Sequence, residues 1–166
     1  MRWTCSRCGK EHVGLPFDWA FDSPMYWDGG RTEDDWLTED LCVWTDDEPK
    51  LNYFIRGVLE IPVEGSEQKL GYGVWSSLSE DSFKQVVQHW DDPARTEQGP
   101  YFGWLSNSIP GYPDTRSLPL DVVIQEVETR PLFVLQEGDH PLIAEQREGI
   151  TTERVRAIAE EQMHEA

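Results

Sequence analysis

The chain has 166 residues, of which 38% are hydrophobic and 11% aromatic, a composition typical of a folded protein rather than a disordered one. Its 14 basic and 32 acidic residues give a net charge of −18, which works against binding to nucleic acid or to an anionic membrane. The cysteine count of three is odd, and no apolar run reaches the length of a signal peptide or a membrane span. We therefore expect a cytoplasmic protein with reduced thiols.

We expect a single domain over residues 1–166, built from three parts. These are a metal-binding arm (1–15), an acidic aromatic loop region (16–40) and an α+β core (41–166).

The arm contains the motif WTCSRCGKEHVGL at residues 3–15. The C-x-x-C spacing of Cys5 and Cys8 lets one turn of backbone direct two thiolates at a common centre, as a zinc ion requires. His12 offers an imidazole nitrogen, and Cys42 offers a third sulfur. The sequence therefore predicts one structural zinc ion per chain, held by these four residues.

Two other interpretations of the cysteines remain open. A thioredoxin-like redox couple needs a strand before the C-x-x-C motif and a helix after it, and nothing ahead of Cys5 suggests such a strand. Alternatively, Cys42 is a free thiol buried in a strand, and His12 is a surface residue.

The loop region is both acidic and aromatic. Residues 18–48 contain eleven acidic residues and one base, Arg31, and six aromatic residues are interleaved with them. One interpretation is a solvated loop that its aromatic side chains pin to the core. The other is a docking face for a basic protein, in which charges steer the partner and aromatic rings anchor it. Its candidate contact residues are Trp27, Glu33, Asp34, Asp35 and Trp36.

The core alternates strand and helix patterns. Residues 41–46, 51–63 and 69–78 predict three strands, joined by connections short enough for an antiparallel meander. The apolar spacing in 79–91 predicts an amphipathic helix with Ser79 as its N-cap. A short helix is expected within 102–109, strands over 118–129 and 130–136, and a second amphipathic helix over 151–164 with Thr151 as its N-cap. The fold class is α+β, with a mainly antiparallel sheet.

Six segments distributed along the chain resemble the bacterial family known as domain of unknown function 2199. They are CSRCGKEHVGLP, DLCVW, FIRGVLEIPV, GVWSSLSEDSF, GPYFGWLSNSIPGYPDT and HPLIAEQREGIT. The resemblance implies a free-standing bacterial cytoplasmic protein, and it brings no catalytic residue with it.

No P-loop, nucleophile elbow or H-E-x-x-H motif is present in the sequence. The sequence therefore favours a small binding or regulatory protein over an enzyme, and immunity proteins against basic toxins are one such class. Tyr101, Trp104 and Tyr112, on a long connection, are further candidate partner-binding residues. The alternative to a binding protein is an enzyme with a pocket near residues 101–112, to which Arg56 or His89 contributes.

Overall fold

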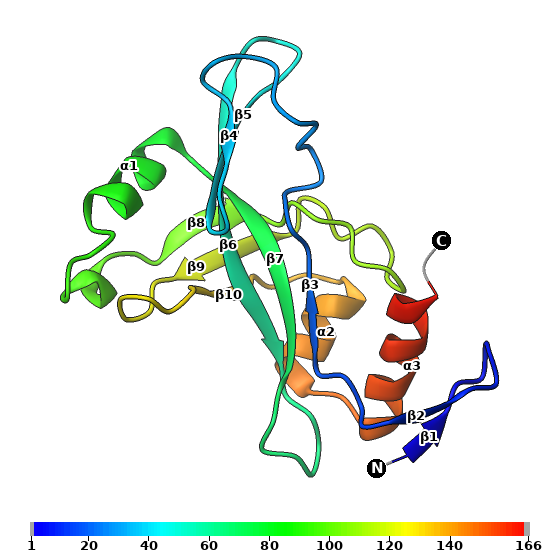
Figure 1. The fold of residues 1–166 in the computed structure, drawn as a ribbon. Helices are drawn as coiled ribbons and strands as arrows, with labels where there is room; N and C mark the ends of the chain where they lie inside the picture. The colour runs from blue at the N-terminus through cyan, green and yellow to red at the C-terminus, as the bar shows by residue number, and fades with distance from the viewer. Residues whose placement is uncertain (1, 165–166) are drawn as a thin grey trace.

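The computed structural model of the chain describes residues 2–164. Its strands are β1 (Arg2–Thr4), β2 (Glu11–Val13), β3 (Asp18–Ala20), β4 (Trp36–Leu37), β5 (Leu41–Thr45), β6 (Leu51–Ile61), β7 (Leu70–Leu78), β8 (Tyr101–Trp104), β9 (Pro119–Val123) and β10 (Leu132–Leu135). Its helices are α1 (Glu80–Gln88), the 3-10 turn η1 (Arg95–Glu97), α2 (Pro141–Glu148) and α3 (Thr152–Met163). The predicted α+β class is confirmed (Figure 1).

Eight strands form one mixed, mostly antiparallel sheet. Its main path runs β3-β7-β6-β10-β9-β8, and β4 and β5 extend it beside β6. The pairings β5–β6 and β6–β7 are antiparallel, which confirms the predicted meander. Only β3–β7 and β6–β10 are parallel among the named strand pairs.

The sheet curves until the chain directly after β8, at one end, reaches β7, the second strand from the other end. Leu105, directly after β8, forms an antiparallel bridge with Ser76 of β7. Gly103 makes this approach possible, because a Cβ at this position would overlap the Ser76 hydroxyl and the Ser77 carbonyl oxygen. The main apolar core fills the space between this curved sheet and the helices, and its members include Leu59, Val74 and Leu120.

The region expected to hold a short helix is instead β8 and an irregular loop. Tyr101, Gly103 and Leu105 lie on the more buried side of the chain, whereas Phe102 and Trp104 are about half exposed. This alternation has the period of two that belongs to a strand, so the expectation of a helix was wrong.

Both predicted amphipathic helices are present with their predicted caps. The Ser79 hydroxyl accepts a hydrogen bond from the backbone of Ser82, and the Thr151 hydroxyl accepts one from that of Arg154. The sequence did not predict α2, which begins with Pro141 and buries Leu142 and Ile143. Within residues 2–164, each helix is too short or too polar to cross a membrane.

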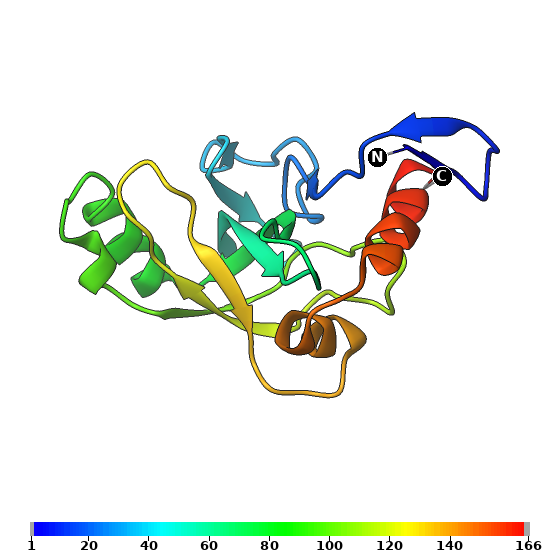
Figure 2. The same cartoon turned by 90° about the horizontal axis from the view of Figure 1, so that it is seen from below.

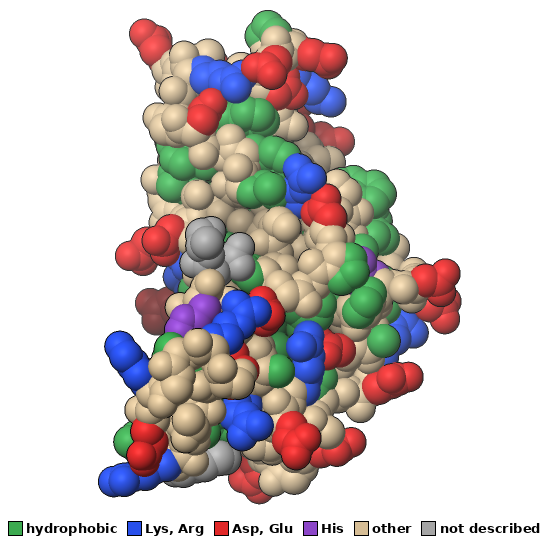
Figure 3. All heavy atoms as spheres, turned by 90° about the vertical axis from the view of Figure 1, so that its right-hand side faces the viewer, with side chains coloured by type: hydrophobic (Ala, Val, Ile, Leu, Met, Phe, Trp, Pro, Cys, Tyr) green, Lys and Arg blue, Asp and Glu red, His purple; other side chains and the backbone are tan. Residues whose placement is uncertain are grey.

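The N-terminal arm is a β1–β2 hairpin that lies beside α3, at the opposite end of the molecule from α1 (Figures 1 and 2). Trp3 is buried there with Cys5 against Ala159 of α3, and its indole N–H donates to the Gly14 carbonyl at 2.9 Å. Basic and acidic side chains are interspersed on the face that carries the arm and α3 (Figure 3). Because Trp3 and Cys5 are buried against Ala159, the arm is a small module packed on the C-terminal helix.

Candidate metal centre

The turn of the β1–β2 hairpin shapes the C-x-x-C segment. The Cys5 N–H donates to the Lys10 carbonyl and the Gly9 N–H donates to the Cys5 carbonyl, both at 2.9 Å. Gly9 has a φ of 72°, in the left-handed region that favours glycine. The turn therefore folds back on itself and brings Cys5 and Cys8 to the same side.

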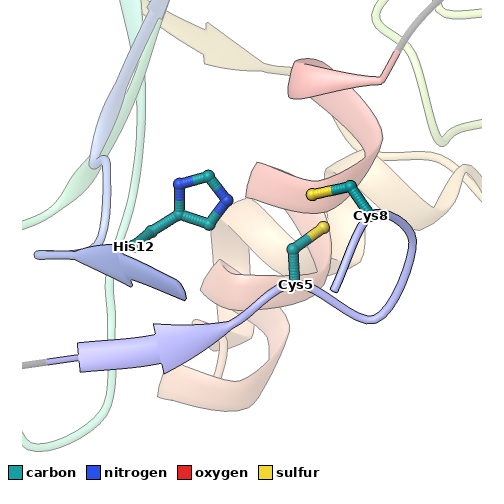
Figure 4. A group of neighbouring side chains, drawn as sticks. All are labelled: Cys5, Cys8 and His12. Atoms are coloured by element: carbon teal, nitrogen blue, oxygen red, sulfur yellow. The ribbon is translucent and has the colours of Figure 1, made fainter. Parts of the chain in front are cut away.

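His12 completes a cluster of three possible ligands. One donor atom each from Cys5, Cys8 and His12 lies within 4.8 Å of the other two, and Figure 4 shows the three side chains turned toward one another. His12 comes from β2, where it is paired with Trp3 and stacks on its ring at a centroid distance of 4.8 Å. This stacking fixes the plane of the imidazole beside the two sulfurs.

The chemistry of the cluster fits a thiophilic metal. The His12 Nε2 atom is buried and has no hydrogen-bond partner among residues 2–164, a costly state for a polar atom that has no ligand. Burial raises the pKa of the Cys5 thiol, but hydrogen bonds from the backbone N–H groups of Cys8 and Arg7 outweigh it, so this pKa is below its ordinary value. The thiolate is the form that binds metal, and sulfur with imidazole nitrogen is the donor set that zinc prefers.

The hairpin also tests the alternative interpretation of Cys5 and Cys8 as a thioredoxin-like redox couple. A strand, β1, does precede Cys5, contrary to the sequence-based expectation, but the chain continues into β2 rather than into a helix. The arm therefore lacks the strand–motif–helix arrangement of a thioredoxin-like couple.

The structure does not bring Cys42 to the cluster. Cys42 lies on β5 and is buried with Phe54 and Trp75 in a hydrophobic group separate from the one that contains Cys5. Burial raises the pKa of its thiol to about 12, so the thiol is neutral near pH 7. Cys42 thus has the character of a buried free thiol, which was the alternative interpretation of this residue.

Sequence reasoning did not consider His164, which directly follows α3. Its Nε2 atom lies 3.1 Å from the Cys5 Sγ atom. The two residues are 159 positions apart, so no spacing rule in the sequence connects them. Only the packing of α3 against the arm reveals the contact.

The predicted docking residues fall into two groups. Asp35 belongs to the internal structure of the loop, because it accepts hydrogen bonds from the Thr45 hydroxyl at 2.5 Å and from the Arg31 N–H at 2.7 Å. Trp27 is partly buried against the group that contains Cys42. Glu33 and Asp34 are exposed, and Trp36 remains 39% exposed.

The three candidate partner-binding residues within 101–112 have different surroundings. Tyr101 lines a pocket of about 620 Å³ between α1 and residues 124–131, together with Arg56 and His89. Trp104 is 46% exposed on the outer side of β8. The Tyr112 hydroxyl donates to Glu145 at 2.5 Å, in a partly buried polar network that includes Arg154 of α3.

The fold and the cluster define an α+β protein whose N-terminal hairpin carries two cysteines and one histidine in metal-binding proximity. The chain belongs to the bacterial family described as "Uncharacterized protein conserved in bacteria (DUF2199)", whose model matches residues 4–150. No curated protein and no solved structure matches the chain.

Proposed function

We propose that the protein binds one structural zinc ion through Cys5, Cys8 and His12, and that this ion fixes the arm to the rest of the fold. The observation that carries the proposal is the proximity of the three donor atoms, all within 4.8 Å of one another. The buried, unpartnered His12 Nε2 supports it, because a metal would satisfy this atom. The three free thiols fit a reducing compartment such as the cytoplasm.

A structural role fits the surroundings better than a catalytic one. Cys5 has no exposed surface, and Trp3 and Ala159 pack with it. A catalytic zinc site keeps one coordination position open to substrate, whereas structural sites are closed. In this arm the bound zinc would supply folding free energy, since a metal that binds only the folded arm stabilises that state.

Elemental analysis of protein purified without chelator tests this proposal. We expect about one zinc ion per chain, with loss of the ion in Cys5→Ser and in Cys8→Ser. Cys42→Ser is the matched control, because it removes a thiol that lies apart from the cluster, and it should retain the metal. Metal-free wild-type protein, or equal zinc loss in the control, would contradict the assignment.

We further propose that the protein is a binding module whose partner is a basic protein that contacts the acidic loop. The support is a charge of −10 over residues 18–48, with Glu33, Asp34 and Trp36 exposed on it. Much of the remaining loop is held by internal bonds, such as the ion pairs of Arg31 with Asp28 and Asp47. The loop is therefore a preorganised surface, which lowers the entropic cost of binding.

Affinity capture from bacterial extract, followed by kinetics on the purified partner, tests the docking face. Neutralising Glu33 and Asp34 together should slow association, and the effect should fade as salt rises. Trp36→Ala should instead speed dissociation. The loss of binding free energy should be about 2 kcal/mol if the ring fills a pocket of the partner. A partner whose binding ignores both salt and these substitutions would place the interface elsewhere.

A second candidate function rests on the 620 Å³ pocket, whose size is that of small-molecule sites. Its floor is built around Arg95, whose guanidinium donates to the carbonyls of Trp90, Gln125, Glu126 and Thr129. His89 at the rim has Nδ1 at 3.2 Å from an Asp92 carboxylate oxygen, an arrangement that serves a general base. Chemical-shift mapping of a metabolite library against wild type and Tyr101→Ala tests it, and a library without any pocket-centred ligand would count against an enzyme.

A further inference from the structure

We infer that His164 is the fourth ligand of the metal centre, so that one zinc ion joins the N-terminal arm to the end of the C-terminal helix. This inference rests on the proposed zinc site and adds the residue that closes it. The His164 Nε2 atom lies 3.1 Å from the Cys5 Sγ atom. In a tetrahedral zinc site a sulfur and a nitrogen ligand are roughly 3.6 Å apart, as follows from bond lengths of about 2.3 and 2.0–2.1 Å.

The end of α3 is held against the cysteine turn by contacts other than this one. Glu160 accepts two hydrogen bonds from Ser6, from its N–H at 2.8 Å and from its hydroxyl at 2.6 Å. Arg7 forms an ion pair with Glu161. Because residues four apart share a face of a helix, the contact at Glu160 directs residue 164 toward the same turn.

The three-residue cluster needs such a ligand. Structural zinc sites are almost always four-coordinate, and the arm by itself offers two sulfurs and one nitrogen. Cys42 is buried elsewhere, and His164 approaches the cluster from the adjacent helix. His164 is not a member of the group within 4.8 Å, so metal binding must draw its ring closer to Cys8 and His12.

A catalytic thiol–imidazole pair would place the same two atoms side by side, but the burial of Cys5 argues against it. A nucleophilic sulfur must be reached by substrate, and Cys5 has no exposed surface. The exposed thiol of the motif belongs to Cys8. A closed metal site accounts for a buried sulfur, a neighbouring imidazole and the unpartnered His12 nitrogen together.

A ligand at residue 164 gives the metal a larger structural role than the arm alone would. It would connect residues 5 and 164, and through α3 it would reach the partly buried network in which Arg154 donates to Glu145 at 2.7 Å. His164 lies beyond residue 150, where the match to the family model ends. The metal would therefore couple the family-matching part of the chain to a helix outside that match.

The test measures zinc affinity by competition with a chromophoric chelator, and cobalt(II) absorption as a report of coordination, on the full chain. We expect His164→Ala to weaken zinc binding by roughly 100-fold or more, since changes to outer-shell groups alone cost about 10–100-fold. The visible cobalt(II) bands of a tetrahedral site should lose intensity. His164→Cys should restore both, because it returns a ligand. Cys42→Ser, which removes a thiol buried apart from the cluster, should match wild type.

Unchanged affinity and unchanged cobalt(II) bands in His164→Ala, with binding abolished in Cys8→Ser, would overturn the assignment of His164 and leave the zinc proposal standing. Wild-type protein that binds neither zinc nor cobalt(II) would overturn both. Because residue 164 follows the last turn of α3, its substitution leaves the helix interior intact. Far-UV circular dichroism verifies that each variant is folded.

Discussion

Replacing Cys8 by serine should unfold the arm while the rest of the protein stays folded. Cys8 is exposed, so the substitution removes a ligand without disturbing a packed core. The arm by itself has little to hold it. Its two strands pair through three residue pairs, and within residues 2–13 Trp3 is the one large side chain that is buried.

The magnitudes support this expectation. Ordering residues 2–13 costs about 18 kcal/mol at about 1.5 kcal/mol each. Burying Trp3 returns about 5 kcal/mol, for roughly 200 Å² at about 25 cal/mol per Å². The proposed zinc ion would contribute about 10–16 kcal/mol, which together with the two hydrogen bonds from Ser6 to Glu160 offsets the remaining cost. Without the metal the arm should therefore be unstable, whereas the sheet keeps its own core.

Hydrogen exchange followed by mass spectrometry measures this directly. In Cys8→Ser, the amides of β1 and β2 should exchange at least about 100-fold faster than in wild type, and those of β6 and β7 should be unchanged. Wild type treated with chelator should reproduce the pattern, and chelator should add nothing to Cys8→Ser. Equal exchange in the arm of zinc-loaded wild type and of Cys8→Ser would show that the arm does not depend on the metal for its stability.

Three further predictions concern the rest of the fold. Because burial raises the pKa of Cys42 to about 12, its thiol should resist iodoacetamide at pH 8 in the native protein and react after unfolding, as peptide mass mapping would reveal; rapid native labelling would refute its burial. Burial raises the pKa of Asp35, but hydrogen bonds from Thr45 and from nearby N–H groups lower it by a larger amount. The pKa of Asp35 in the folded protein is therefore below its ordinary value. The resulting stability is present above the unfolded pKa and is lost as pH falls through the folded pKa. In Asp35→Asn, the free energy of unfolding measured by urea titration should therefore fall less as the pH is lowered. Gly103→Ala should lower the free energy of unfolding by about 1–3 kcal/mol in the same assay, because its methyl group would overlap Ser76. If the variant is as stable as wild type, the contact between residue 103 and β7 is loose.

Local patterns in the sequence were enough for much of the fold. The three-strand meander and the helices α1 and α3 have clear periodicities and caps, and these elements are present in the structure. The region around Gly103 was assigned to a helix because Phe102, Leu105 and Ile109 have helical spacing, whereas contacts with β7 and β9 impose the strand. α2 was not predicted because its apolar residues, such as Leu142 and Ile143, are adjacent rather than spaced along one face.

Part of the candidate metal site could likewise be predicted from the sequence, and part could not. Cys5, Cys8 and His12 lie within one hairpin, so their spacing alone indicates a ligand cluster. The fourth position depends on which distant element packs beside the arm. Cys42 was chosen for its chemistry, but β5 buries it among apolar side chains, while α3 brings His164 to the sulfur. A contact across 159 positions follows from tertiary packing and leaves no trace in local spacing.

X-ray absorption at the zinc edge of the purified protein tests the proposed metal centre, because it reports both the element and its neighbouring atoms. Ligation by Cys5, Cys8, His12 and His164 predicts about two sulfur atoms at roughly 2.3 Å and two nitrogen atoms at roughly 2.0–2.1 Å from the metal. A spectrum with three or four sulfur neighbours would contradict the donor set, and the absence of a zinc edge would contradict the metal centre itself.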